Sequence, residues 1–245
     1  MEKIRFCTAG DTAALSFARS QLAAWGCEVV APGPDVTHLL LPVPSLEEDG
    51  SIRGGGDLTA LLAQLPQEVT VIGGMLPPLP CQTVDLLKDP YYLAHNAAIT
   101  AHCALGLTLG HLRGTLQQMP VLIIGWGRIG KCLANLLKAV GAEVTVAVRS
   151  PSDAAMLEAL GYRHLLLPHC PAQGFRIIYN TVPAPVMAAA DARPGTLLID
   201  LASTRGIAGE PVLWARGLPN KIAPEASGAL MAKMALRYAL RKELA

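Results

Sequence analysis

The chain has 245 residues, of which 51% are apolar and 16% charged, with a formal net charge of +1 at pH 7. This length allows one or two domains with a large core, and the near-neutral charge argues against nucleic acid as a partner. The apolar excess predicts self-association. No apolar run reaches membrane-spanning length and no secretory signal is evident, so we expect a soluble cytoplasmic protein without a membrane partner.

The first ninety residues alternate between strand and helix signals, which predicts a small α/β domain over residues 1–92. The expected strands cover residues 4–7, 28–31, 37–43 and 69–72, and the expected helices cover residues 12–25 and 58–65. The first turn, Thr8-Ala9-Gly10-Asp11, lacks a three-glycine pattern, so we expect this domain to shape a cleft rather than hold a dinucleotide. A helix from residue 93 to about 112 follows, within a linking segment over residues 93–116.

Residues 121–150 have the pattern of a mononucleotide-binding unit. Residues 121–124 are an apolar, mainly β-branched run, which predicts a strand buried on both faces. Residues 129–140 carry an apolar stripe at helical spacing, and Gly141 follows as a stop signal. A second strand over residues 144–148 completes a β-α-β unit.

The turn between the first strand and the helix is Gly125-Trp126-Gly127-Arg128-Ile129-Gly130. The first glycine permits the tight turn, the second lets a pyrophosphate approach the backbone, and the third lets helix and strand pack closely. The free N–H groups at the helix N-terminus attract the anion. Because strand, helix and second strand all fall where this mechanism needs them, the segment predicts a dinucleotide site.

Arg149 and Ser150 follow the second strand, at the offset where an NAD-binding unit places a carboxylate for the ribose. An acid would repel a 2′-phosphate there, whereas a guanidinium and a hydroxyl can bind one. The cofactor predicted from these residues is therefore NADP. The alternative is that Arg149 is an ordinary solvated surface arginine.

Beyond residue 150 the alternation resumes, and residues 117–223 are predicted to form a Rossmann domain. The expected helices cover residues 153–160, 185–190 and 224–244, and the expected strands cover residues 164–167, 176–179 and 196–200. The last helix can pack on the N-terminal domain. The predicted fold class is α/β: a Rossmann-type doubly wound parallel sheet preceded by a smaller α/β domain, in a two-domain architecture like that of dehydrogenases.

Polar residues follow two of the expected strands at the edge where parallel sheets bind ligands. Asn180, Thr181 and Pro183 follow one strand, and Ser203 and Arg205 lie in the segment after the next. Thr181 and Pro183 are predicted to help hold the cofactor, and the other three to face the nicotinamide edge. The alternative is that residues such as Asn180 and Pro183 only form turns.

The cysteines and histidines do not form a metal pattern. The six cysteines show no CxxC spacing, which indicates reduced core thiols. His164, His169 and Cys170 lie close in the sequence, but no fourth ligand is evident, so we expect no zinc site.

The chain resembles the family of dipicolinate synthase A subunits over nearly its whole length. The resemblance is carried by the glycine turn with its Arg149-Ser150 ending and by three other segments: LLLPVP at residues 39–44, LLIDLASTRG at residues 197–206 and GLPNKIAPEASG at residues 217–228. It implies an oxidoreductase of endospore formation that oxidises dihydrodipicolinate to dipicolinate with NADP as hydride acceptor. It also implies a flavoprotein-like second subunit.

The chain departs from the family pattern along the linking helix. Where the family resembles N-x-I-P-T-x-E-G, residues 96–103 read NAAITAHC, so Ile99, His102 and Cys103 replace proline, glutamate and glycine. If that glutamate transfers a proton, His102 has to take its place. The family's Ala-Pro-x-Thr-Ala-Gly likewise becomes APEASG at residues 223–228.

The implied substrate carries two carboxylates, for which Arg205 is the candidate partner by its position. Aromatisation also needs loss of a proton, and His95 and His102, seven positions apart on one helix face, could each accept it. Two other readings remain open: a non-catalytic NADP-binding subunit that senses or scaffolds, and another NADP-dependent dehydrogenase of a small carboxylate. A 2-hydroxyacid dehydrogenase is disfavoured because it needs a late histidine, and none follows His169.

Overall fold

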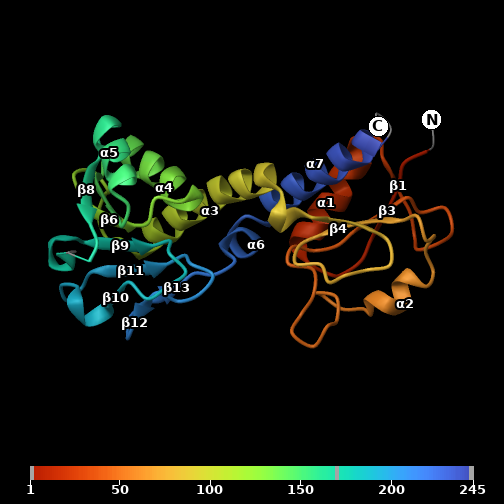
Figure 1. Cartoon of the computed structure of the whole chain (residues 1–245), viewed down its shortest axis with the longest axis horizontal. Coiled ribbons are helices and arrows are strands. Elements are labelled where there is room, and N and C mark those ends of the chain that lie inside the picture. The colour runs from red at the N-terminus through yellow and green to blue at the C-terminus, as the bar shows by residue number, and fades with distance from the viewer. Residues whose placement is uncertain (1–2, 169–170, 243–245) are drawn as a thin grey trace. The chain divides into compact units, whose positions relative to one another are not determined.

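The computed structural model describes residues 3–168 and 171–242. The chain forms two compact units, which we call the N-terminal unit (Met1–Asn96 with Pro219–Ala245) and the central unit (Ala97–Leu218). Each is built on a parallel sheet with helices connecting its strands, as the alternating sequence pattern predicts (Figure 1). The predicted α/β, dehydrogenase-like fold class is therefore confirmed.

The N-terminal unit contains a five-stranded parallel sheet in the order β2-β1-β3-β4-β5. Its strands are β1 (Arg5–Thr8), β2 (Glu28–Val29), β3 (His38–Leu40), β4 (Thr70–Gly73) and β5 (Gln82–Asp85). Its helices are α1 (Ala13–Ala24), α2 (Leu58–Leu62), the 3-10 helix η1 (Leu86–Lys88), α6 (Leu218–Ile222), which starts at the boundary, and α7 (Pro224–Lys242).

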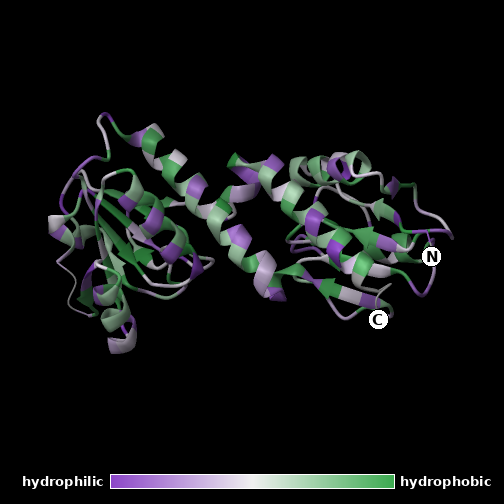
Figure 2. Cartoon of the chain, turned by 90° about the horizontal axis from the view of Figure 1, so that it is seen from above, coloured by the Kyte–Doolittle hydropathy of each residue, from purple (hydrophilic) through white to green (hydrophobic). Residues whose placement is uncertain are grey.

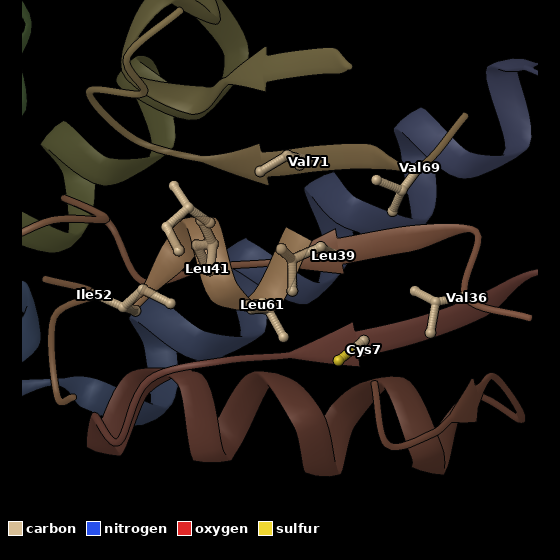
Figure 3. Close-up of a cluster of buried hydrophobic side chains, with 9 residues drawn as sticks. Cys7, Val36, Leu39, Leu41, Ile52, Leu61, Val69 and Val71 are labelled. Atoms are coloured by element: carbon tan, nitrogen blue, oxygen red, sulfur yellow. The ribbon is translucent and has the colours of Figure 1, made fainter. Parts of the chain in front are cut away.

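One face of this sheet is closed by a cluster of apolar side chains (Figure 3). Leu39, Leu41 and Val71 come from adjoining segments of the sheet and are fully buried, and Leu61 of α2 packs against the same cluster. Burial of a Val or Leu side chain stabilises a fold by about 1.5–3 kcal/mol. This cluster therefore fixes the short helix α2 to a sheet whose strands have two to four residues.

Helix α7 returns to the N-terminal unit and packs along α1. Gly228 is required at the crossing, because a Cβ there would collide with the carbonyl oxygen of Ala14. The Tyr238 hydroxyl of α7 donates to Asp89 Oδ2 at 2.5 Å, and the Tyr92 N–H donates to Asp89 Oδ1 at 2.8 Å. Burial opposes ionisation of Asp89, but these two hydrogen bonds, a third from the Tyr91 N–H and the charge of Arg237 together outweigh it and lower the pKa of its carboxyl group.

The central unit contains a six-stranded parallel sheet in the order β13-β11-β9-β6-β7-β8. The strands are β6 (Pro120–Ile124), β7 (Glu143–Val148), β8 (Arg163–Leu166), β9 (Ile177–Asn180), β11 (Leu197–Asp200) and β13 (Leu213–Trp214), with a separate parallel pair β10 (Met187–Ala188) and β12 (Ile207–Ala208). The helices are α3 (Pro90–His111), which begins in the N-terminal unit, α4 (Arg128–Ala139), α5 (Pro151–Ala159) and the 3-10 helices η2 (Ala172–Gly174) and η3 (Ala189–Asp191).

The central sheet is largely apolar, and α4 is strongly amphipathic. The strands of this unit are coloured as hydrophobic, whereas polar and apolar residues alternate along its helices (Figure 2). Residues 121–124 of β6 are all buried, as expected for a strand covered on both faces. Within the described part of the chain, no helix is both long and apolar enough to cross a membrane.

One sequence prediction of secondary structure was wrong, and several short elements were not predicted. The helix expected over residues 185–190 is instead the short strand β10 followed by η3, because Met187 pairs with Ile207 and the Val186 N–H donates to the Gly206 carbonyl at 2.9 Å. Strand β5 was not predicted. It is a half-exposed edge strand that contains Gln82 and Thr83 and pairs only with β4, so its sequence lacks a buried apolar run.

Candidate dinucleotide-binding site

The order of the central sheet places its topological switch point between β6 and β9, the position at which open parallel sheets bind ligands. The strands lie in the order β6-β7-β8 on one side of this point and β9-β11-β13 on the other side. This arrangement is typical of Rossmann folds. Because all six strands are parallel, their carboxyl ends share one edge. The loops after β6, β7, β9 and β11 therefore begin at that edge. The predicted site residues other than His102 lie in these loops, at the end of β9 (Asn180) or in the first turn of α4 (residues 128–130).

The glycine turn after β6 is closed by contacts that only glycine permits. Gly125 has φ of 104°, and a Cβ on it would lie 2.5 Å from Thr181 Oγ1. A Cβ on Gly130 would collide with the Gly125 carbonyl oxygen. The Thr181 hydroxyl donates to the Ile124 carbonyl at 2.9 Å, so this predicted cofactor residue is bonded to the end of β6, directly before the turn.

Gly127 differs from the other two glycines of the turn. It lies in the open, with no atom within 4 Å of the position that a Cβ would occupy, and its φ of −77° is accessible to any residue. It is the N-cap of α4, and no side chain caps the helix there. Space and uncapped N–H groups together fit a pyrophosphate. Arg128 is exposed beside it, and Trp126 and Ile129 are half-buried.

Arg149 directly follows β7, next to the glycine turn. The Gly125 N–H donates to the carbonyl of Ala147, two residues before Arg149, at 2.9 Å. Arg149 is exposed, and none of the described residues holds its guanidinium in a hydrogen bond or ion pair. Ser150 is the N-cap of α5, where its Oγ accepts the Asp153 N–H at 3.4 Å. Its hydroxyl proton is available to a ligand.

Asn180 and Asp200 lock the ends of β9 and β11 together. Both are fully buried, and Asn180 Nδ2 donates to Asp200 Oδ1 at 3.0 Å. The other Asn180 bonds are local: Nδ2 donates to the Val182 carbonyl at 3.0 Å, and Oδ1 accepts the Val182 N–H at 2.9 Å. Asn180 is therefore buried and fully engaged in bonds within the central unit, and the catalytic role expected for it from the sequence stays a prediction.

The Asp200 carboxylate organises the loop that follows β11. Oδ1 accepts the Ala202 N–H at 3.0 Å as well as the Asn180 amide, and Oδ2 accepts the N–H groups of Gly206 and Ile207 at 2.7 and 2.9 Å. Gly206 must be glycine, since a Cβ would lie 2.4 Å from the Ala184 carbonyl oxygen. We call residues 201–207, held in this way, the Asp200 loop.

Ser203 of the Asp200 loop is exposed to solvent, whereas most of the Arg205 guanidinium is bonded to neighbouring residues of the chain. Arg205 Nε donates to the Ile207 carbonyl at 3.0 Å, and Nη2 donates to the Gly209 carbonyl at 2.5 Å and to Glu210 Oε1 at 2.8 Å. Nη1 takes part in none of the described bonds. Within the described residues, Nη1 of Arg205 is therefore free for a ligand, whereas the sequence suggests that the whole guanidinium is free. Pro183 is exposed on the loop after β9.

The two candidate histidines lie on α3. His102 is exposed, and no described contact joins it to the loops after β6, β7, β9 and β11. His95 stacks against Tyr91, with ring centroids 4.1 Å apart. The sequence did not indicate the buried bond between Tyr179 of β9 and Thr108 of α3, whose Oγ1 also donates to the Ala104 carbonyl at 2.8 Å. Burial raises the pKa of Tyr179 to about 12 and keeps its hydroxyl protonated.

The described residues contain no group of three histidine, cysteine, aspartate or glutamate side chains that could hold a metal ion. His169 and Cys170, which the sequence placed near His164, lie outside the described residues.

Residues 107–184 match the NAD binding domain model of the D-isomer specific 2-hydroxyacid dehydrogenases. This range covers the glycine turn, Arg149 and Asn180, and it supports a nicotinamide dinucleotide as the cofactor. The central unit is thus a dehydrogenase-type nucleotide-binding domain.

Two kinds of comparison point to the same relatives. The A subunit of dipicolinate synthase from Bacillus subtilis (strain 168) is 28% identical over 166 residues, which span 62% of this chain and 55% of that protein, little more than half its length. The crystal structure of the same subunit from Bacillus halodurans superposes with a TM-score of 0.85 at 21% identity, covering 96% of this chain and 97% of the other. The crystal structure of the B. subtilis protein gives a TM-score of 0.83 at 20% identity, with 99% and 97% coverage.

Proposed function

We propose, from the similarity of the chain to the A subunit of dipicolinate synthase, that it is an oxidoreductase that oxidises dihydrodipicolinate to dipicolinate with NADP. The observation that carries the proposal is the joint placement of the glycine turn and the Asp200 loop at one sheet edge. A cofactor site and a polar loop for a small substrate are the two parts that a dehydrogenase reaction requires.

The bound cofactor would accept a hydride from the dihydropyridine ring, and the ring would lose one proton to become aromatic. The residues of this chain then have three tasks. The glycine turn holds the pyrophosphate through the N-terminus of α4, Thr181 keeps the turn closed, and the Asp200 loop presents its polar groups toward the reacting ring. Asn180 and Asp200 act by positioning these loops.

Cofactor choice is assigned to Arg149 and Ser150. An exposed guanidinium without a described partner, directly after β7, can pair with a 2′-phosphate, and the Ser150 hydroxyl can donate to the same group. NADP is therefore preferred to NAD in this proposal.

Replacing Arg149 by alanine is expected to weaken NADPH binding about tenfold or more while changing NADH binding little, because only NADPH carries the phosphate. Isothermal titration of both cofactors measures this difference. Arg163→Ala is the matched control, since Arg163 is an exposed arginine of the same unit whose Nη1 pairs with Glu143 at 3.0 Å. Equal losses of affinity for the two cofactors in Arg149→Ala would show that Arg149 does not read the phosphate.

The two substrate carboxylates need donors, and the Asp200 loop offers Arg205 Nη1 and the Ser203 hydroxyl. Arg205 is oriented by its bonds to Ile207 and Gly209, so its remaining edge is held in one direction. A fixed guanidinium loses little conformational freedom when it binds a carboxylate.

The proton leaving the ring is assigned to His102, which takes the position of the glutamate in the related motif. A neutral imidazole nitrogen can accept a proton, which is what this task requires. Formation of an aromatic ring favours the reaction, so a weak base is sufficient.

The relative's name describes one subunit of a larger assembly, and we propose that this chain self-associates and binds a second, flavoprotein-like subunit. This leaves a second candidate function: a dinucleotide-binding subunit whose partner performs the chemistry. The burial of Asn180 and the internal bonds of Arg205 favour this alternative, because they leave few free polar groups at the site. A 2-hydroxyacid dehydrogenase reaction is less favoured, since no histidine follows His169.

The test mixes the purified chain with dihydrodipicolinate and NADP, with and without a candidate flavoprotein-like partner, and follows the absorbance of the reduced cofactor. Turnover by the chain alone is the expected result. Turnover only with the partner supports the scaffolding alternative, and no turnover in either sample contradicts the assigned reaction. NAD in place of NADP provides the control for cofactor choice.

A further inference from the structure

The central unit carries a hollow whose lining residues, apart from Trp126 of the glycine turn, have no part in the proposed dehydrogenase reaction. It has a volume of about 690 Å³ and lies along α4 and α5. We call it the aromatic–lysine hollow; it is lined by Trp126, Lys131, Asn135, Lys138, Met156, Leu160 and Tyr162.

Two aromatic rings are among the lining residues of the hollow. Trp126 and Tyr162 meet edge to face, with ring centroids 5.5 Å apart and planes inclined by 61°. Both residues are half-buried, so part of each is accessible to solvent. Met156 and Leu160 are 55% and 52% exposed and add apolar surface from α5 and its C-terminal end. Partly exposed aromatic rings beside such surface suit a flat ring as ligand.

Two ammonium groups complete the hollow, and no carboxylate is among its lining residues. Lys131 Nζ lies 5.8 Å from the centre of the Trp126 ring, and Lys138 Nζ lies 4.5 Å from the centre of the Tyr162 ring. Within the described residues neither lysine is in an ion pair; Lys138 donates only to the Gly161 carbonyl, at 3.3 Å. The cation–π contacts of exposed lysines are weak and can be exchanged for a bond to an anion.

We propose that the aromatic–lysine hollow binds a planar aromatic carboxylate, whose ring stacks on Trp126 while its carboxylates pair with Lys131 and Lys138. This occupant matches both halves of the lining, because an aliphatic anion would leave the rings uncovered and a neutral aromatic would leave the ammonium groups unpaired. The product of the proposed reaction, pyridine-2,6-dicarboxylate, has this chemistry. The choice of this probe rests on the proposed function.

Binding at the hollow is expected to affect the cofactor, because Trp126 belongs to both sites. It is the second residue of the glycine turn, and its ring is the one on which the ligand would stack. Any change in cofactor affinity on binding must be matched by an equal change in ligand affinity when cofactor is present. The hollow would thereby let an aromatic acid regulate occupancy of the dinucleotide site.

The test titrates the intact protein with pyridine-2,6-dicarboxylate in a buffer free of divalent cations. Isothermal titration gives the affinity, and quenching of tryptophan fluorescence reports contact with Trp126. We expect saturable binding with quenching that is lost in Trp126→Phe. The double variant Lys131→Gln, Lys138→Gln is expected to bind at least tenfold more weakly, and the charge-preserving variant Lys131→Arg, Lys138→Arg is expected to retain most of the affinity.

Two small ligands separate the contributions of ring and charge. Cyclohexane-1,3-dicarboxylate keeps both charges without the aromatic ring, and pyridine-2,6-dicarboxamide keeps the ring without the charges; each is expected to bind at least tenfold more weakly than the dicarboxylate. Equal affinity of the glutamine and wild-type proteins, equal affinity for cyclohexane-1,3-dicarboxylate, or no binding of the dicarboxylate would each overturn the proposal. Turnover is measured on the same preparations. Binding that depends on the lysines, in a protein without turnover, would support the hollow and contradict the proposed function. Turnover without such binding would support the proposed function and contradict the hollow.

Discussion

The Gly127→Ala variant should bind the dinucleotide at least tenfold more weakly than the wild type, a loss of about 1.4 kcal/mol or more, and should keep its thermal stability. A methyl group at this position meets no protein atom within 4 Å, and the backbone already has a conformation that alanine adopts. The fold therefore tolerates the change. The pyrophosphate does not, because the second glycine of the turn is where the phosphates approach the backbone most closely.

Isothermal titration with NADP and a thermal melt measure the two effects separately. Gly174→Ala is the matched control, since Gly174 also has no atom within 4 Å of an added Cβ and lies outside the turn. Unchanged cofactor affinity in Gly127→Ala would mean that the dinucleotide does not approach this turn, and the assignment of the site would fail with it.

Asp200→Asn is expected to lower the free energy of unfolding by about 3 kcal/mol. The wild-type carboxylate accepts four hydrogen bonds, two on each oxygen, from Asn180, Ala202, Gly206 and Ile207. Asparagine has the same shape, but its amide nitrogen is itself a donor and would face two donors at a fully buried position. Those N–H groups then lose their acceptor without gaining water.

Urea denaturation followed by circular dichroism measures this loss. Asp191→Asn is the control: Asp191 is an exposed aspartate of the same unit that accepts a single N–H, from Ala188 at 2.8 Å, and its substitution should change stability by less than about 1 kcal/mol. Equal losses in the two variants would mean that Asp200 does not hold the loop. Because the Asp200 loop also presents Ser203 and Arg205, Asp200→Asn should reduce turnover as well.

The sequence was sufficient to predict the β-α-β unit around the glycine turn, because its signals are local. Residues 121–124 are uniformly apolar, the helix after them has one apolar stripe, and both the turn and Arg149 follow at fixed spacings. The predicted helix ended within one residue of α4, whose last residue is Ala139.

The features that could not be predicted depend on contacts between distant segments. Residues 185–190 have helix-compatible composition, but pairing of Met187 with Ile207 makes them extended. Arg205 resembles a free substrate ligand in the sequence, and only the folded loop shows that Gly209 and Glu210 use its donors. Local composition carries no information about such partners, since tertiary contacts override intrinsic preference.

The four-bond arrangement at Asp200 has a consequence for the energetics of ligand binding. Ordering a flexible segment of this length costs about 1–2 kcal/mol of conformational entropy per residue. Here the carboxylate orders the segment as the chain folds, so an incoming molecule meets donors that are already in place. A ligand that binds at this loop would therefore not have to order its backbone, and the remaining costs would be desolvation and the lost freedom of the ligand and of side chains such as Ser203.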